Sequence, residues 1–136
     1  MAWMQMSDDC KIKFLELKEK RTYRFIVFKI NKDDEIVQID KIGNSEETTY
    51  DDFTSYLPYD ECRFAVYDFD FTTEDNCQKR KIFFIGWFPD ASTPRNKMLY
   101  ASSKDSIKTA LDGIEVDLLV TEPNEMSLDI MKERAL

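Results

Sequence analysis

The residues best suited to chemistry in this sequence are two carboxylates one residue apart, Asp68 and Asp70. In an extended strand both would project from one face, where they could share a divalent cation. The same spacing occurs in some metal and nucleotide-sugar sites. However, the chain is short for such an enzyme and lacks a glycine-rich loop to hold a phosphate. The sequence therefore favours the alternative, a strand end whose carboxylates lie in solvent or bind nearby backbone N–H groups.

Other catalytic groups are scarce. The chain has no histidine, which removes the usual general base, the commonest metal ligand and the usual pH switch near neutrality. Its cysteines, Cys10, Cys62 and Cys77, are too few and too widely spaced for a standard zinc site. Without histidine a thiol enzyme of the papain type is also excluded. We therefore expect a binding module and not an enzyme, with no metal ion and no cofactor.

A second candidate site lies on the segment 94–111, where apolar residues recur with helical spacing. Pro94 suits the first helical position, Ser92 or Thr93 can cap the helix, and Gly113 follows its end. At about 100° per residue one face should be buried. That face comprises Leu99, Tyr100, Ser103, Ile107, Ala110 and Leu111.

The opposite side of this helix combines positive charge with one apolar side chain. A stripe along one flank consists of Lys97, Ala101, Lys104 and Lys108. Arg95, Met98 and Ser102 lie beside it, so Met98 should point away from the core. Such a face is suited to an acidic partner. The alternative is an ordinary solvated face that carries one stray methionine.

Composition limits the remaining classes of protein. With 136 residues, 43% of them hydrophobic, the chain is long enough for one domain with a substantial core. A net charge of −8 argues against a general nucleic-acid binder, which needs a broad positive field. Three cysteines without a signal peptide indicate free thiols in a reducing compartment. No apolar run approaches the length of a membrane span, so no transmembrane segment is expected.

Three further segments are predicted to be helical. Ser7 is a candidate N-cap for the first helix, with two aspartates in its positive first turn. The apolar side of that helix comprises Cys10, Phe14, Leu15 and Leu17. The second helix covers 50–57 and the last covers 127–134.

Segments rich in β-branched and aromatic residues predict strands at 23–30, 35–42, 62–71, 81–88 and 114–120. The first two should form a hairpin, and 72–80 is expected to be a polar connection. The order α-ββ-α-ββ-α-β-α predicts an α/β fold of the layered α+β kind, with a mixed central sheet of about five strands flanked by helices on both faces. The helix 94–111 should be the crossover that joins two parallel strands.

Several segments also form a recognisable pattern. They are 10–18, 24–30, 57–63, 67–71, 76–79, 81–85, 87–90, 95–98 and 100–105. The most specific stretch is Lys-Met-Leu-Tyr-Ala-Ser-Ser-Lys-Asp at 97–105. This pattern resembles the actin-depolymerising factor/cofilin family, in particular its plant branch. The resemblance implies the actin-depolymerising factor homology fold as a single domain over 7–136, after a divergent N-terminal extension over 1–6.

The resemblance also implies a function. Family members bind actin monomers and filaments, usually favouring the ADP form, and sever or depolymerise filaments without acting as enzymes. Two alternatives stay open, a filament-stabilising or bundling variant and a phosphoinositide-binding module. The expected protein is a monomer of the cytoplasm and cytoskeleton, with the nucleus as a further location. Its expected partners are actin and phosphoinositides, with no nucleic acid.

Matched by position, the resemblance implies two groups of actin-binding residues. On the helix 94–111 they are Arg95, Lys97, Met98 and Ser102, with Lys104 and Lys108 as a secondary basic stripe. Filament-specific contacts match the basic approach to the strand 81–88 and the last helix. These residues are Lys79, Arg80, Lys81, Lys132 and Arg134.

The sequence departs from the family pattern in three respects. The family carries a regulatory serine just after the first methionine, and none stands there, so Ser7 is the remaining candidate phosphorylation site. The extension 1–6 also leaves the N-terminal actin contact open. Thr109 replaces an often basic residue, and Asn96 replaces the usual serine with little expected effect. Because histidine is absent, no imidazole can make the activity depend on pH.

Overall fold

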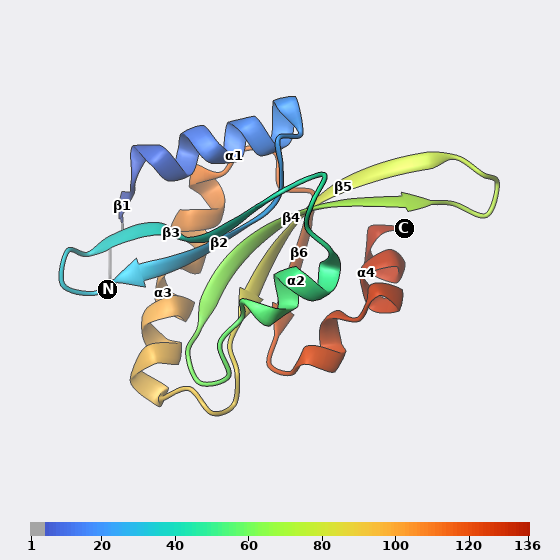
Figure 1. Cartoon of the computed structure of the whole chain (residues 1–136). Coiled ribbons are helices and arrows are strands. Elements are labelled where there is room, and N and C mark those ends of the chain that lie inside the picture. The colour runs from blue at the N-terminus through green and yellow to red at the C-terminus, as the bar shows by residue number, and fades with distance from the viewer. Residues whose placement is uncertain (1–4) are drawn as a thin grey trace.

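The computed structural model describes residues 5–136, in which a six-stranded sheet separates two layers of helices (Figure 1). The strands are β1 (Gln5–Met6), β2 (Tyr23–Asn31), β3 (Ile36–Asn44), β4 (Arg63–Thr72), β5 (Gln78–Trp87) and β6 (Val116–Val120). Their order across the sheet is β1-β3-β2-β4-β5-β6, with β1–β3 and β5–β6 parallel and the other pairs antiparallel. The predicted mixed sheet and its parallel crossover are confirmed.

The sheet has one strand more than the expected five. Gln5 and Met6 were assigned to the divergent extension, but they pair with Ile36 and Val37 of β3. Two residues are too few to show a strand pattern in a sequence, which explains why this edge strand is missed. The rest of the predicted extension, residues 1–4, lies outside the described residues.

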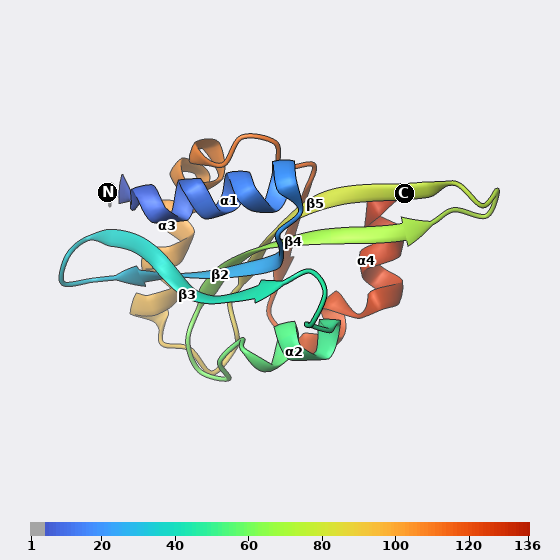
Figure 2. The same ribbon diagram turned by 45° about the horizontal axis from the view of Figure 1, so that its top comes forward.

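Helices cover both faces of the sheet, as predicted. They are α1 (Asp8–Lys20), α2 (Tyr50–Ser55), α3 (Pro94–Ala110) and α4 (Leu128–Ala135), with a 3₁₀ helix η1 (Pro123–Met126) before α4. Helices α1 and α3 bury one cluster of side chains against the sheet, and α2 and α4 bury the other; Figure 2 shows α1 above the sheet and α2 below it. Each layer has its own buried cluster, with Phe14 and Tyr100 in the first and Phe53 and Met131 in the second.

Helix α1 shows where a helical pattern can mislead. Ser7 is its N-cap, because the hydroxyl accepts a hydrogen bond from the Cys10 backbone N–H at 3.3 Å. Cys10, Phe14 and Leu17 are buried, but Leu15 is 50% exposed and the prediction for it was wrong. Leu15 follows Phe14 by one residue, which turns it about 100° away from the buried stripe.

Helix α3 begins at the predicted place and docks through Tyr100. Of the two candidate caps, Thr93 accepts from the Asn96 N–H at 3.1 Å. Tyr100 is 2% exposed, and its hydroxyl accepts a hydrogen bond from the backbone N–H of Ile30 in β2 at 2.9 Å. Its ring lies 5.1 Å from that of Phe64. These contacts fix both the depth and the rotation of α3 on the sheet.

The buried face of α3 agrees with the prediction along most of its length. Ser103, Ile107 and Leu111 are buried, and Leu99 is partly buried. The prediction was wrong for Ala110, which is exposed. Ala110 instead lines an open groove between the end of α3 and the start of α1, while Ile107 and Leu111 beside it stay buried.

Strands β4 and β5 extend past their neighbours as a two-stranded ribbon (Figure 1). β2 pairs with β4 only over 64–67, and β6 pairs with β5 only over 83–87. Beyond these positions 68–72 pairs solely with 78–82. The polar connection predicted over 72–80 is therefore shorter than expected, because only 73–77 separates the strands. Residues 78–81 contain no apolar side chain, so their pattern does not indicate a strand.

Charged side chains gather at the base of this ribbon. Asp68 is 1% exposed, and its carboxylate accepts hydrogen bonds from Arg21 Nε at 3.2 Å and Arg80 Nε at 2.7 Å. Asp70 accepts from Arg21 Nη2 at 2.5 Å and from Arg24 Nη1 at 2.9 Å. Since Arg21 is the C-cap of α1 and Arg24 lies in β2, these ion pairs attach the ribbon to both elements.

The docking of α3 can be tested at its hydroxyl. Replacing Tyr100 by Phe should lower the free energy of unfolding by about 1–3 kcal/mol, because the buried Ile30 N–H loses its acceptor. Urea denaturation followed by circular dichroism measures the change. Tyr59 is 82% exposed, and the matched variant Tyr59→Phe should change the stability by less than about 0.5 kcal/mol. Equal losses in the two variants would contradict the assigned role of Tyr100.

The ribbon ion pairs predict a dependence of stability on pH. Burial raises the pKa of the Asp70 carboxyl, but hydrogen bonds and charge from Arg21 and Arg24 outweigh burial and leave that pKa below its usual value. A lowered pKa in the folded state stabilises the fold above the unfolded-state pKa, and this stability is lost as the pH falls through the folded-state pKa. Acidification below about pH 4 should therefore remove the contribution of Asp70.

The Asp70→Asn variant isolates this contribution. It should be roughly 0.5–1 kcal/mol less stable than wild type at pH 7, because Asp70 is partly exposed, and the difference should shrink at pH 3. Urea denaturation at both pH values gives the comparison. Asp105→Asn, at an exposed position of α3, is the control. A difference for Asp70→Asn that stayed constant between the two pH values would exclude the proposed linkage.

Candidate functional site

The outward face of α3 presents an apolar side chain among cations. Met98 is 72% exposed, which confirms that it points away from the core. Arg95 and Ser102 are exposed, and Lys97 is partly exposed with its Nζ 3.3 Å from the Asp90 carbonyl oxygen. Because all four residues belong to one docked helix, the backbone holds them at fixed positions relative to one another. We refer to Arg95, Lys97, Met98 and Ser102 as the α3 face.

Asn96 has a larger role than the sequence suggested. Its Oδ1 accepts a hydrogen bond from the backbone N–H of Cys62 at 2.8 Å, which ties the start of α3 to the start of β4. Because that partner lies 34 residues away, helical spacing does not reveal the bond, and the expectation that the substitution matters little stays a prediction. Asn96 thus helps to hold the α3 face in position.

A second group of cations forms where the ribbon meets α4. The strand register places Lys79 opposite Phe71 and Lys81 opposite Phe69, so both lysines share a ribbon face with these aromatic rings. Lys79, Lys81 and Phe71 line a hollow together with Ala135, the last residue of α4, and Leu136, which follows it.

This contact places the two segments that carry the predicted filament-specific residues side by side. Lys132 and Arg134 are exposed on α4, which lies beside the ribbon in both views (Figures 1 and 2). We refer to Lys79, Lys81, Lys132 and Arg134 as the ribbon–α4 surface. It joins residues from segments about 50 positions apart, as the resemblance implied.

Arg80 lies on the other face of the ribbon. Side chains alternate along a strand, so Arg80 shares its face with Asp68 and Asp70. Besides its bond to Asp68, its Nη2 donates to the carbonyl oxygens of Leu17 at 3.1 Å and Lys18 at 2.8 Å. The structure thus separates Arg80 from Lys79 and Lys81, with which the sequence grouped it.

The secondary basic stripe of α3 is largely paired within the molecule. Lys108 Nζ lies 2.9 Å, and Lys104 Nζ 3.3 Å, from Oδ2 of Asp117 in β6. Arg134 of α4 donates to the backbone carbonyl of Asp117 at 2.9 Å. Burial raises the pKa of the Asp117 carboxyl, but the two lysines outweigh burial and lower it. Asp117 therefore links α3 to α4, a role that no sequence pattern signalled.

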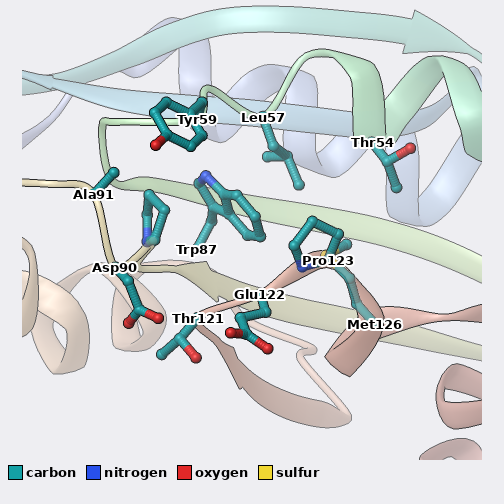
Figure 3. A pocket seen from close by; sticks show the side chains of 11 residues that line it. Thr54, Leu57, Tyr59, Trp87, Asp90, Ala91, Thr121, Glu122, Pro123 and Met126 are labelled. Atoms are coloured by element: carbon teal, nitrogen blue, oxygen red, sulfur yellow. The ribbon is translucent and has the colours of Figure 1, made fainter.

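An apolar groove of about 390 Å³ opens next to the start of α3 (Figure 3). Trp87 forms its floor, and Tyr59 stands at its rim, 82% exposed. Asp90 and Glu122 also line it. Sequence reasoning did not find this groove, because its lining comes from segments distant in the chain.

The carboxylates of Asp68 and Asp70, which could have shared a divalent cation, form ion pairs within the molecule. Asp68 and Asp70 do share one face, as expected, but the cations that they meet are guanidinium groups. The favoured alternative, with carboxylates in solvent or on backbone N–H groups, was wrong for Asp68, which is buried in ion pairs. Asp70 is partly in solvent, but its carboxylate is also bound by Arg21 and Arg24. Within residues 5–136 no group of three His, Cys, Asp or Glu side chains is placed to hold a metal ion. Nor does any helix in that range have the length and apolar character of a membrane span.

Comparison with known proteins agrees with this geometry. The family model of cofilin/tropomyosin-type actin-binding proteins matches residues 4–136. Actin-depolymerizing factor 8 of Arabidopsis thaliana is 70% identical over 131 residues, which are 96% of this chain and 93% of that protein. Actin-depolymerizing factor 1 of Oryza sativa subsp. japonica is 62% identical over 133 residues, or 98% and 95% of the two chains.

Solved structures show the same fold. The cofilin structure from Streptomyces griseoflavus matches with a TM-score of 0.89 at 33% identity, covering 98% of this chain and 97% of that one. Actin depolymerization factor 2 of Plasmodium berghei matches with a TM-score of 0.86 at 30% identity, with the same coverage. The sequence match over nearly the whole chain and the shared layered fold together show that this chain belongs to the cofilin/actin-depolymerising factor family of actin-binding proteins.

Proposed function

We propose that this chain is a monomeric protein that binds actin monomers and filaments, preferring the ADP form, and severs and depolymerises filaments. The observation that carries the proposal is the α3 face, where Met98 is 72% exposed. Around the helix, Arg95 and Lys97 lie on either side of it. The names of the relatives, actin-depolymerizing factors, support the same activity. The proposed activity needs binding alone and no catalytic step. It belongs to the cytoskeleton of the cytoplasm, and a nuclear pool stays a prediction.

The two surfaces have different proposed tasks. The α3 face would bind one actin subunit, whether free or in a filament. The ribbon–α4 surface would add the contact made only in filaments. A ligand shifts a two-state polymer only through its different affinity for the two states. We infer that two rigidly connected surfaces fit a twisted filament better than an untwisted one, so bound segments twist and their boundaries break.

Charge supports this orientation of binding. The chain carries a net charge of −8, yet both proposed surfaces are basic. Local cations on an acidic protein attract an acidic partner to one side and repel it elsewhere. Binding should therefore weaken as salt rises, because screening shortens the range of this attraction.

The two alternative functions are weaker. Phosphoinositide binding would use the same cations, but Lys104 and Lys108 already pair with Asp117, and the net charge opposes approach to an anionic membrane. For filament bundling the structure offers no specific support. Microscopy of filaments separates severing from bundling, because severing shortens filaments and bundling produces thick cables.

Ser7 is proposed as a structural cap and not as a control site. Its hydroxyl accepts from the Cys10 N–H and donates to Cys10 Sγ at 3.1 Å. A phosphoryl group there would lose the donated bond and would lie next to Asp8 and Asp9. Phosphorylation at Ser7 therefore remains a prediction of the resemblance that the local geometry does not favour.

The α3 face can be tested by removing its two cations. The double variant Arg95→Ala/Lys97→Ala should weaken binding to both monomers and filaments by about tenfold or more, since each surface cation orients the acidic partner. Fluorescence titration of labelled monomers and co-sedimentation with filaments measure the two affinities. Lys11→Ala/Lys20→Ala removes the same charge from exposed positions of α1 and should have little effect. Unchanged affinities in the first variant would refute the proposed face.

The division of tasks predicts a selective loss. Lys79→Ala/Lys81→Ala should lower filament affinity by about tenfold while leaving monomer affinity within about twofold of wild type. The same two assays apply, and the Lys11→Ala/Lys20→Ala variant again controls for net charge. A parallel loss of both affinities would show that the ribbon–α4 surface is not specific to filaments.

A further inference from the structure

The ribbon–α4 surface depends on a ribbon that its own sheet hardly supports. Past 67 in β4 and before 83 in β5, the two strands have only each other as strand partners, apart from one backbone bond from the Glu115 N–H to the Ile82 carbonyl at 2.9 Å. An isolated two-stranded hairpin is at best marginally stable in water. The direction in which the ribbon leaves the sheet must therefore be set by side chains on its two faces.

One face of the ribbon is held by apolar packing. Phe69 and Phe71 are each 7% exposed, and they belong to the same buried cluster as Met131 and Ala135 of α4. Their rings stack with centroids 5.7 Å apart. This packing draws the ribbon toward α4, but apolar contacts are not directional and do not fix its angle.

The other face is held by directed bonds, of which Arg80 makes three. Its Nε donates to the buried carboxylate of Asp68, and its Nη2 donates to the carbonyls of Leu17 and Lys18. Those carbonyls belong to the last turn of α1. They lack their usual helical donors, because the N–H groups of Arg21 and Thr22 both donate to the Glu16 carbonyl oxygen. The end of a helix leaves carbonyls unpaired and carries partial negative charge, which a cation stabilises.

We propose that Arg80 is a positioning residue for filament binding and not a contact residue. Its guanidinium fixes the angle between the ribbon and α1, and thereby places Lys79 and Lys81 beside α4. The inference rests on the proposed function, because it concerns how the ribbon–α4 surface meets a filament. Arginine suits this role since its planar fork of five donors can serve a carboxylate and two carbonyls at once, whereas lysine offers one compact ammonium group.

The test compares neighbouring residues on opposite faces of one strand. Arg80→Ala and Lys79→Ala each remove one positive charge, from the inner and the outer face respectively. Each variant is assayed for filament co-sedimentation, for monomer binding and for amide hydrogen exchange of the segments 68–72 and 78–82. Arg80→Lys, which keeps the charge and loses the fork, is measured beside them and carries the same test if Arg80→Ala fails to fold.

We expect distinct results from the two positions. Arg80→Ala should lower filament affinity by about tenfold, keep monomer affinity within about twofold, and speed exchange in the ribbon by about tenfold while β2 stays protected. Arg80→Lys should shift these three measurements in the same directions. Lys79→Ala should lower filament affinity without changing exchange in the ribbon, because the Lys79 side chain lies on the face opposite to the bonds with α1.

Other outcomes would overturn the inference. Wild-type filament affinity in Arg80→Ala would exclude a positioning role, and reduced affinity with unchanged ribbon exchange would make Arg80 a direct contact. Equal losses of monomer and filament binding would indicate general destabilisation. If the wild-type chain itself failed to bind filaments, the proposed function would fall, and the positioning role with it. Exchange in the ribbon would then still reveal whether Arg80 braces it.

Discussion

The seating of α3 on the sheet determines what the molecule presents to a partner. Tyr100 is bound at its hydroxyl by a backbone N–H of β2, and Ser103 and Ile107 are buried on the same face of the helix. Once these side chains are buried, a period of 3.6 residues per turn leaves Met98 facing outward. A single methionine in solvent is unremarkable alone, but here the packing of the whole layer holds it between Arg95 and Lys97. The proposed recognition surface is thus a consequence of core packing.

In the ribbon too, the backbone geometry decides which side chains face outward, here because side chains alternate with a period of two residues. Alternation along β5 sends Lys79 and Lys81 to the face that meets α4, and Arg80 to the face that meets α1. Of these three adjacent basic residues, Lys79 and Lys81 therefore lie at the surface, and Arg80 forms hydrogen bonds within the molecule. Net charge or local density of cations would not distinguish them, whereas the pleat of the strand does.

Much of this arrangement can be predicted from sequence because it follows from local periodicity. The helical spacing in 94–111 is enough to predict the helix, its buried side and the outward Met98. The missed features depend on partners distant in the chain. The strand at 78–81 is polar and exists through pairing with β4, Arg80 is directed by carbonyls 62 and 63 residues away, and Asp117 acquires its role only when α3 and α4 flank β6. Leu15 shows the opposite limit, since one helical step separates a buried position from an exposed one.

The cations that bind Asp117 have a consequence for copies of the chain that lie close together. β6 ends the sheet, and an outer strand with free N–H and C=O groups can recruit a strand from another molecule. Lys104, Lys108 and Arg134 all bind Asp117 on this strand, and the opposite border, β1, has two residues within the described part of the chain. Copies of this chain lying side by side along one polymer would therefore have no ready border at which to fuse their sheets. Dense decoration of a filament and resistance to self-aggregation would then share one structural cause.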